Sequence, residues 1–191
     1  MPAAGSGHRF APLPVVRCAA GDDAVAVAEV HDAAWRTAYA ELIASGHIDV
    51  YPFERRVRLW RSRIDESGPG RSAQLFVAER DDVVAGFAML GPQRDRRLTD
   101  LGWRAELLSL YVHPQAQKRG LGRLLFSAAA HRLLDLGQAR LSLWVLMAND
   151  PARRAYRALG GRVIGSQAAP EGSPPGLGRI AYGWDDLTAL L

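Results

Sequence analysis

Apolar residues change their spacing several times along the chain, and each change marks a predicted element. Spacings of three to four residues predict helices at about 22–39, 53–66, 120–137 and 150–159. Runs rich in apolar and β-branched residues predict strands at 15–19, 74–80, 83–90, 106–112, 141–147, 162–164 and 179–184. About four helices among these strands indicate an α+β fold built around a mixed sheet.

Cap residues support the predicted helix boundaries. Asp22 or Asp23 is expected to begin the first helix. Asp150 is expected to cap the last helix, with Pro151 at its first helical position. The segment 91–104 is polar and rich in arginine, so it is predicted to be a loop.

The length and composition fit one globular domain after a short tail. Residues 1–14 are rich in Gly, Ala and Pro and are predicted to be disordered, which leaves 15–191 as a single domain. Cys18 is the only cysteine, so no disulfide forms within one chain. No apolar run reaches the roughly 18 residues of a membrane span, and the N-terminus has no signal-peptide core. We therefore expect a cytoplasmic protein with no membrane partner.

The basic charge is spread along the chain instead of being gathered in one motif. The net charge of +4 and the isoelectric point near 9.7 would by themselves suggest a nucleic-acid partner. The densest group of arginines, at positions 55, 56, 58, 61 and 63, has the spacing of the solvated face of an amphipathic helix. No nucleic-acid partner is predicted. The five histidines show no metal-ligand spacing, so no metal is predicted either.

The segment that carries chemistry begins directly after a predicted strand. Gly120 and Gly122 start a helix there, where glycines let the backbone approach a phosphate and the helix N-terminus favours negative charge. Lys118, Arg119 and Arg123 add positive charge. The segment lacks the Gly-Lys-Ser/Thr of the Walker loop and the third glycine of the dinucleotide fingerprint. A helix start with glycines kept for packing is the alternative.

Two motifs in this part of the chain resemble those of the GNAT superfamily of N-acetyltransferases. The segment 110–123 (LYVHPQAQKRGLGR) is similar to the acyl-CoA-binding motif, whose core Arg/Gln-x-x-Gly-x-Gly/Ala is matched by Gln117, Gly120 and Gly122. The segment 149–161 (NDPARRAYRALGG) is similar to the second motif, with an asparagine after the fifth strand and a tyrosine one turn before two glycines. Both occur in the order and spacing of the family. An early helix around 35–39 (WRTAY) is also similar to one bacterial branch.

The resemblance implies the GNAT fold, a mixed and mostly antiparallel sheet in which the fourth and fifth strands splay apart. It also implies acetyl-CoA as co-substrate, with the thioester in that gap. Leu110, Tyr111 and Val112 would pair with the pantetheine arm, and a backbone N–H there would polarise the thioester carbonyl. The implied cofactor-binding residues are Leu110, Tyr111, Val112, Gln117, Lys118, Arg119, Gly120, Leu121, Gly122, Arg123, Asn149 and Tyr156.

The implied activity is transfer of an acetyl group to a primary amine, by direct attack through a tetrahedral intermediate. A protonated amine is not a nucleophile, so a base has to remove a proton, usually through water. Glu106 stands where some family members carry a catalytic glutamate; the alternative is an exposed carboxylate without a role. Other members place a base five residues before Asn149, but Trp144 occupies that position and cannot serve. Ordered water and backbone carbonyls are the remaining acceptors.

Tyr156 matches the family tyrosine that assists the departing thiolate. Its alternative is a core aromatic residue, because Ala152, Ala155 and Leu159 share its helix face. A non-catalytic module of the same fold, which binds acyl-CoA as a regulatory ligand, is the alternative function.

The acceptor is not identified by the sequence. Family members form the acceptor pocket from the first two helices and the loop between the last two strands, which makes Trp35 and Tyr39 candidates, with Tyr182 further out. Each of these aromatic residues fits a core position equally well. No acidic cluster is evident, so a polycationic amine is not favoured. Small amines, peptide N-termini and protein lysines stay open as acceptors, and a homodimer is compatible with the sequence.

Overall fold

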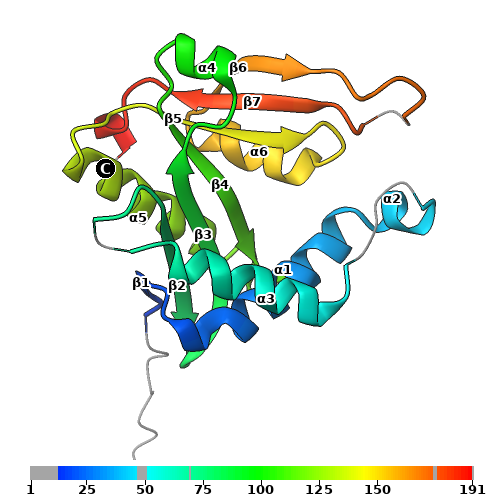
Figure 1. Cartoon of the computed structure of the whole chain (residues 1–191), viewed down its shortest axis with the longest axis vertical. Coiled ribbons are helices and arrows are strands. Elements are labelled where there is room, and N and C mark those ends of the chain that lie inside the picture. Colours follow the sequence, from blue (N-terminus) through cyan, green and yellow to red (C-terminus); the bar gives the residue numbers. More distant parts are fainter. Residues whose placement is uncertain (1–12, 47–50, 69, 174–175, 191) are drawn as a thin grey trace, which may run out of the picture.

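A seven-stranded sheet forms the centre of the computed structural model (Figure 1), which describes residues 13–46, 51–68, 70–173 and 176–190. The strands are β1 (Val15–Cys18), β2 (Gln74–Arg80), β3 (Val83–Pro92), β4 (Ala105–Val112), β5 (Leu141–Leu146), β6 (Arg162–Gln167) and β7 (Arg179–Trp184). The helices are α1 (Ala24–Ala38), α2 (Ala40–Ala44), α3 (Phe53–Asp65), α4 (Arg96–Asp100), α5 (Leu121–Asp135) and α6 (Asp150–Ala158). The predicted tail lies outside the described residues, except for its last two positions.

The sheet is antiparallel except at one junction. Its strand order is β1-β2-β3-β4-β5-β7-β6, and only β4 and β5 are parallel neighbours. These two strands pair at a single position, Glu106 with Ser142, where Ser142 Oγ also donates to the carbonyl of Ala105 at 3.0 Å. Beyond that point they diverge toward their C-terminal ends (Figure 1). The predicted mixed sheet with splayed fourth and fifth strands is confirmed.

Alternation along β2 shows which helices cover which face of the sheet. Phe76 and Ala78 belong to the core cluster that contains the apolar side of α5, whereas Leu75 and Val77 belong to the cluster of α1 and α3. The α5 cluster continues across β5, β7 and Tyr156 of α6. On the opposite face, the β5–β7 half has its own small cluster, which consists of Leu98, Trp103 and Ala181 with Trp144 and Ile164 packed against it.

The predicted loop at 91–104 is wrong in part. β3 continues to Pro92, and α4 follows after Asp95. Asp95 caps α4, because its Oδ1 accepts a hydrogen bond from the N–H of Arg97 at 2.9 Å. Leu98 of α4 is buried against the β5–β7 half. A five-residue helix is too short to give a periodic pattern, which explains why the sequence did not reveal it.

One predicted helix cap is also wrong. Asn149 caps α6 instead of Asp150, and its Oδ1 accepts from the N–H of Ala152 at 3.1 Å. Asp23 stands at the predicted start of α1, but its carboxylate makes no cap bond to that helix. It pairs with the guanidinium of Arg17 at 2.7 Å, because β1 brings this arginine within reach.

Candidate active site

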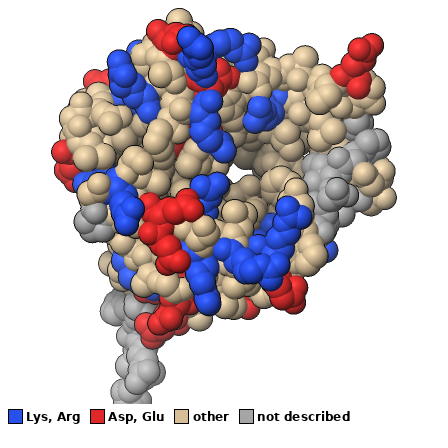
Figure 2. Space-filling view, viewed as in Figure 1, with Lys and Arg blue, Asp and Glu red and all other residues tan. Residues whose placement is uncertain are grey.

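A cavity of about 920 Å³ lies between β4 and β5. It is bounded by the C-terminal parts of both strands, the end of α1 and the first turns of α5 and α6. The predicted site residues that line it are Trp35, Tyr39, Leu110, Tyr111, Val112, Gln117, Lys118, Leu121, Gly122, Asn149 and Tyr156. Arg119, Gly120 and Arg123 are outside this lining, and Glu106 lines an adjoining pocket. In the space-filling view the molecule is hollowed at its middle, between the regions of β4 and α6 (Figure 2).

The C-terminal half of β4 presents backbone groups to this cavity. On one side, Leu110 pairs with Ala88 and Tyr111 with Phe87 of β3. On the other side, β5 pairs only with Glu106, so the following N–H and C=O groups on that edge face the gap. A free strand edge binds an extended ligand through main-chain hydrogen bonds. This edge therefore fits the pantetheine arm, which carries two amide groups.

The N-terminus of α5 has the geometry of an anion site. Gly120 is its N-cap with φ of 85° and, as a glycine, supplies no side-chain cap to the first N–H groups. A Cβ atom on Gly120 would meet nothing within 4 Å, so the positive φ, and not crowding, requires glycine. Lys118, Arg119 and Arg123 are exposed around this helix start. These groups fit the diphosphate of a coenzyme A molecule.

Tyr156 is buried on the inner side of α6, with 9% of its surface exposed. Its ring centroid lies 5.9 Å from that of Tyr182 and 6.3 Å from that of Trp184. The side chain lines the cavity, and no hydrogen bond joins its hydroxyl to another described residue. Burial raises the pKa of Tyr156 above its ordinary value, so the phenol remains a hydrogen-bond donor at working pH.

Asn149 and Tyr39 contact each other across the cavity. Asn149 Nδ2 donates to Tyr39 Oη at 3.2 Å, while its Oδ1 caps α6. Tyr39 is 6% exposed, and burial raises the pKa of its hydroxyl. Because both ends of the Asn149 amide are engaged, its orientation is fixed. This bond joins the end of α1 to the start of α6.

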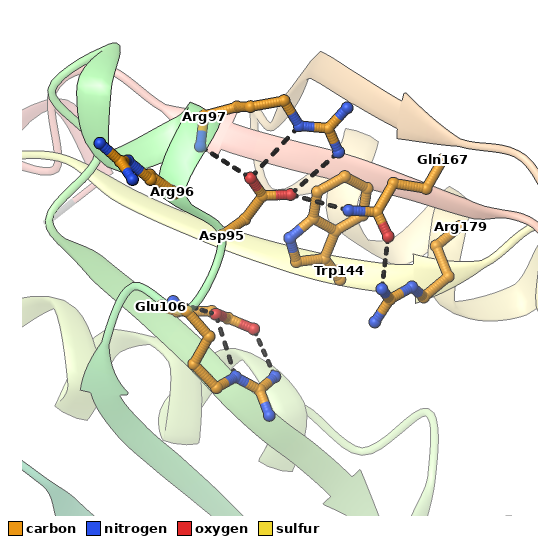
Figure 3. A pocket seen from close by; sticks show the side chains of 8 residues that line it. Asp95, Arg96, Arg97, Glu106, Trp144, Gln167 and Arg179 are labelled. Carbon is orange, nitrogen blue, oxygen red and sulfur yellow. Dashed lines mark hydrogen bonds and ion pairs between the residues drawn. The ribbon is translucent and has the colours of Figure 1, made fainter.

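Glu106 is a buried carboxylate held by one arginine (Figure 3). Only 1% of its side chain is exposed, so the predicted alternative of an exposed strand-start carboxylate is wrong. Arg94 Nη2 donates to Oε1 at 2.6 Å, and Arg94 Nε and backbone N–H donate to Oε2 at 3.2 Å and 3.1 Å. These hydrogen bonds raise the pKa of the Arg94 guanidinium. Glu106 stands at the one position where β4 and β5 pair, at the closed end of the gap.

An adjoining pocket of about 440 Å³ is rich in arginine (Figure 3). Its lining consists of Arg94, Asp95, Arg96, Arg97, Glu106, Trp144, Gln167 and Arg179. Asp95 Oδ2 accepts from Gln167 Nε2 at 2.7 Å, and Gln167 Oε1 accepts from the guanidinium of Arg179. Arg94, Trp144 and Arg179 line both cavities, so the pocket and the gap between β4 and β5 adjoin.

The linings of the two cavities were only partly predicted from the sequence. Trp35 and Tyr39 do line the larger cavity, whereas Tyr182 is fully buried and lines neither one. Arg94 and Arg179 were missed. The available signal for Arg94 was the run of arginines in the segment predicted as a loop, whereas Arg179 stands at the start of a predicted strand and carried no such signal.

Within the described part of the chain, no three His, Cys, Asp or Glu side chains group as a metal site would require. No helix within the same ranges combines the length and apolarity needed to cross a bilayer.

Comparison with known proteins identifies the family. Residues 27–160 match the model of the Acetyltransferase (GNAT) family. The uncharacterised N-acetyltransferase YuaI of Bacillus subtilis (strain 168) is 30% identical over 179 residues, which are 93% of this chain and 96% of that protein. Phosphinothricin N-acetyltransferase of Streptomyces viridochromogenes is 33% identical over 112 residues, or 59% of this chain and 56% of that protein.

Solved structures agree in fold. The PaiA N-acetyltransferase of Thermoplasma acidophilum, solved in complex with coenzyme A, superposes with a TM-score of 0.67 at 20% identity. The superposition covers 91% of this chain and 99% of that one. The family model, the relatives and the sheet with its splayed strands agree, and the chain belongs to the GNAT family as an N-acetyltransferase.

Proposed function

We propose that this enzyme transfers the acetyl group of acetyl-CoA to the amino group of a small molecule by direct attack. One observation carries the proposal: the gap between β4 and β5 extends to the first turn of α5 and adjoins the arginine-rich pocket with Glu106. The cofactor and the amine would enter from different sides and meet in the gap. Direct attack requires no acyl-enzyme intermediate, so Cys18, which is exposed on β1, has no role in this scheme.

The proposed binding of acetyl-CoA rests more on the geometry of the backbone than on side chains. The edge of β4 from Leu110 to Val112 would pair with the pantetheine arm, and the N-terminus of α5 with Lys118 would hold the diphosphate. The fixed amide of Asn149 would contact the amide groups of the arm. Bound acetyl-CoA would supply the acetyl group as a thioester.

Glu106 is the group best placed to accept the proton of the amine. It is buried at the closed end of the gap and faces the arginine-rich pocket of about 440 Å³, which would hold the amine and is called the acceptor pocket below. Its bonds to Arg94 keep both carboxylate oxygens engaged in the free enzyme, so proton transfer through a water molecule fits this geometry better than direct contact.

Tyr156 is placed to assist the departing thiolate. Its reference pKa near 10 exceeds the value of about 8.5 for a thiol, so complete proton transfer to the thiolate is uphill for the free groups. Burial raises the pKa of Tyr156 further. Its role is therefore hydrogen-bond donation to developing negative charge, which becomes stronger in a cavity shielded from water.

The size of the acceptor pocket supports a small acceptor. A volume of about 440 Å³ is typical of small-molecule sites. One relative, phosphinothricin N-acetyltransferase, is named for a small amine.

A panel of amines tests the proposal. The purified protein would be incubated with acetyl-CoA and single amines, while free thiol is followed optically and acetylated products by mass spectrometry. We expect thiol release that depends on the amine, with one acetyl group added to the acceptor. If the protein binds acetyl-CoA but acetylates no small amine, the proposal is wrong.

A further inference from the structure

The acceptor pocket contains more positive than negative charge. Four arginines line it, at positions 94, 96, 97 and 179, against the two carboxylates of Asp95 and Glu106. The space-filling view shows Lys and Arg side chains on both sides of the hollow at the middle of the molecule (Figure 2). The excess of two positive charges would attract an anion and repel a polycation.

Both carboxylates already have a cationic partner. Glu106 pairs with Arg94 at 2.6 Å, and Asp95 pairs with Arg97 at 3.3 Å. Neither Arg96 nor Arg179 forms an ion pair with any residue that the structure describes. Arg96 is directed away from Trp144 in Figure 3, whereas Arg179, an exposed residue at the start of β7, lies at the rim of the pocket beside Gln167 and Trp144.

Arg179 is held in place by neutral groups. Its guanidinium donates to the side-chain carbonyl of Gln167, which is fixed in turn by Asp95 at 2.7 Å. Its charge centre lies 5.4 Å from the ring centroid of Trp144, close enough for a cation–π contact. A guanidinium positioned in this way keeps other N–H groups available for an oxyanion, which it binds in a fork geometry.

Arg179 also occupies the right place for a group that orients the amine. It lines both the acceptor pocket and the gap between β4 and β5, as Arg94 and Trp144 do. The cofactor phosphates have a separate site at the N-terminus of α5. Arg179 is therefore not needed to neutralise the phosphates of the cofactor.

We propose that the acceptor is a small primary amine that carries an oxyanion, such as an amino acid, and that Arg179 binds this oxyanion. The inference rests on the proposed function. The oxyanion bound at Arg179 would fix one end of the molecule and leave its amino group toward Glu106 and the gap. Arg179 would then be a specificity residue, and polycationic amines would be excluded by charge.

Binding of matched amine pairs tests this inference without requiring turnover. Each pair consists of an α-amino acid and its carboxamide, which differ in one negative charge, and an aminoalkylphosphonate provides a second oxyanion. Affinity would be measured by calorimetry on the protein saturated with coenzyme A. We expect one or more acids to bind on the order of 10- to 100-fold more tightly than their carboxamides, as for charge-assisted hydrogen bonds. A phosphonate bound more tightly than the matched acid would support a tetrahedral oxyanion as the natural group.

Variants connect this preference to one side chain. Arg179→Gln should remove the preference and leave affinity for coenzyme A within about twofold, and Arg179→Lys should retain part of it. Arg58→Gln is the control, because Arg58 is exposed on α3 and lines neither cavity. Equal affinity of acids and carboxamides, no binding of either, or a preference that survives Arg179→Gln would overturn the inference. Failure of the proposed function is a separate result, in which the acids bind but no amine is acetylated.

Discussion

Tyr156 offers a test at the scale of one atom, because phenylalanine deletes its hydroxyl and keeps its ring. Tyr156→Phe should lower kcat by roughly 10- to 1000-fold, a loss of about 1.4–4 kcal/mol of transition-state stabilisation. Affinity for acetyl-CoA and the melting temperature should barely change, because no described residue loses a hydrogen bond. Steady-state kinetics and thermal unfolding on one preparation measure both effects.

Tyr182→Phe is the matched control for that substitution. The Tyr182 hydroxyl is also buried and has no partner among the described residues, but it lies outside both cavities. Its removal should leave turnover unchanged. If Tyr156→Phe also turns over at the wild-type rate, Tyr156 has no part in the mechanism.

Glu106→Gln tests the base at the same scale, since glutamine keeps the shape, removes the basicity and retains one oxygen that can accept from Arg94. If Glu106 accepts the proton, kcat/KM should fall by on the order of 10²–10⁴ and the rise of rate with pH should change shape. The melting temperature should also fall, because Glu106 is buried and the amide NH2 cannot accept the hydrogen bonds that Arg94 donates, so the kinetic constants are compared on the folded variant. A normal rate and pH profile would instead assign the proton to ordered water and backbone carbonyls.

At the scale of elements, two glycine substitutions distinguish a loss of cofactor binding at the start of α5 from a loss of stability caused by backbone strain. Gly120 and Gly137 flank the same helix with φ of 85° and 71°, and a Cβ on either would meet nothing within 4 Å. Leucine at either position should lower the free energy of unfolding by about 1–2 kcal/mol, because both residues have left-handed backbone conformations. Only Gly120→Leu should also raise KM for acetyl-CoA several-fold, because its side chain would enter the anion site. Equal KM values in the two variants would contradict the phosphate assignment.

The packing of α1 against α3 gives a pH-dependent contribution to stability. His31 of α1 accepts a hydrogen bond from Trp60 Nε1 at 3.0 Å, and burial, with a smaller effect of Arg56, lowers its pKa to about 3. The unfolded chain binds this proton near pH 6.5, so the unfolded state is favoured as pH falls between 6.5 and 3. The free energy of unfolding should decrease by up to about 1.4 kcal/mol per pH unit in this window.

Urea unfolding at pH 7, 6 and 5 measures that slope. His31→Asn keeps an acceptor for Trp60 and removes the titration, so its slope should be shallower. Identical slopes for the two proteins would show that His31 keeps an ordinary pKa in the folded state.

Most elements of this fold were predictable, because long helices and β-rich runs carry a clear period. The exceptions are short or ambiguous. α2 and α4, which were both missed, have only five residues each, and Asn149 and Asp150 are adjacent residues that both favour a cap position. Most of the site residues that the family resemblance indicated do line the cavity between β4 and β5. Arg94 and Arg179 could not be assigned, because their partners Glu106 and Gln167 come close only in the folded chain.

At the scale of the whole molecule, the cofactor should stabilise the fold. Acetyl-CoA at a hundredfold excess over Kd should add about 2.7 kcal/mol, which for a chain of this size raises the melting temperature by roughly 5–10 °C. ATP at the same concentration serves as a control for unspecific phosphate binding. A melting temperature that millimolar acetyl-CoA does not change would exclude the cofactor assignment.

The hydrophobic core is continuous on one face of the sheet and divided on the other. On the α5 face one cluster spans β2 to β7, whereas on the opposite face the clusters of α1–α3 and of Leu98 are separate. With a single β4–β5 pair between them, rotation of one half against the other should widen or narrow the acceptor side while the α5 side stays packed. Hydrogen exchange would report this as faster local opening in β6, β7 and α4 than in β2 and β3. We expect the same asymmetry to let acceptors enter and leave through small rotations, without unfolding of the cofactor site.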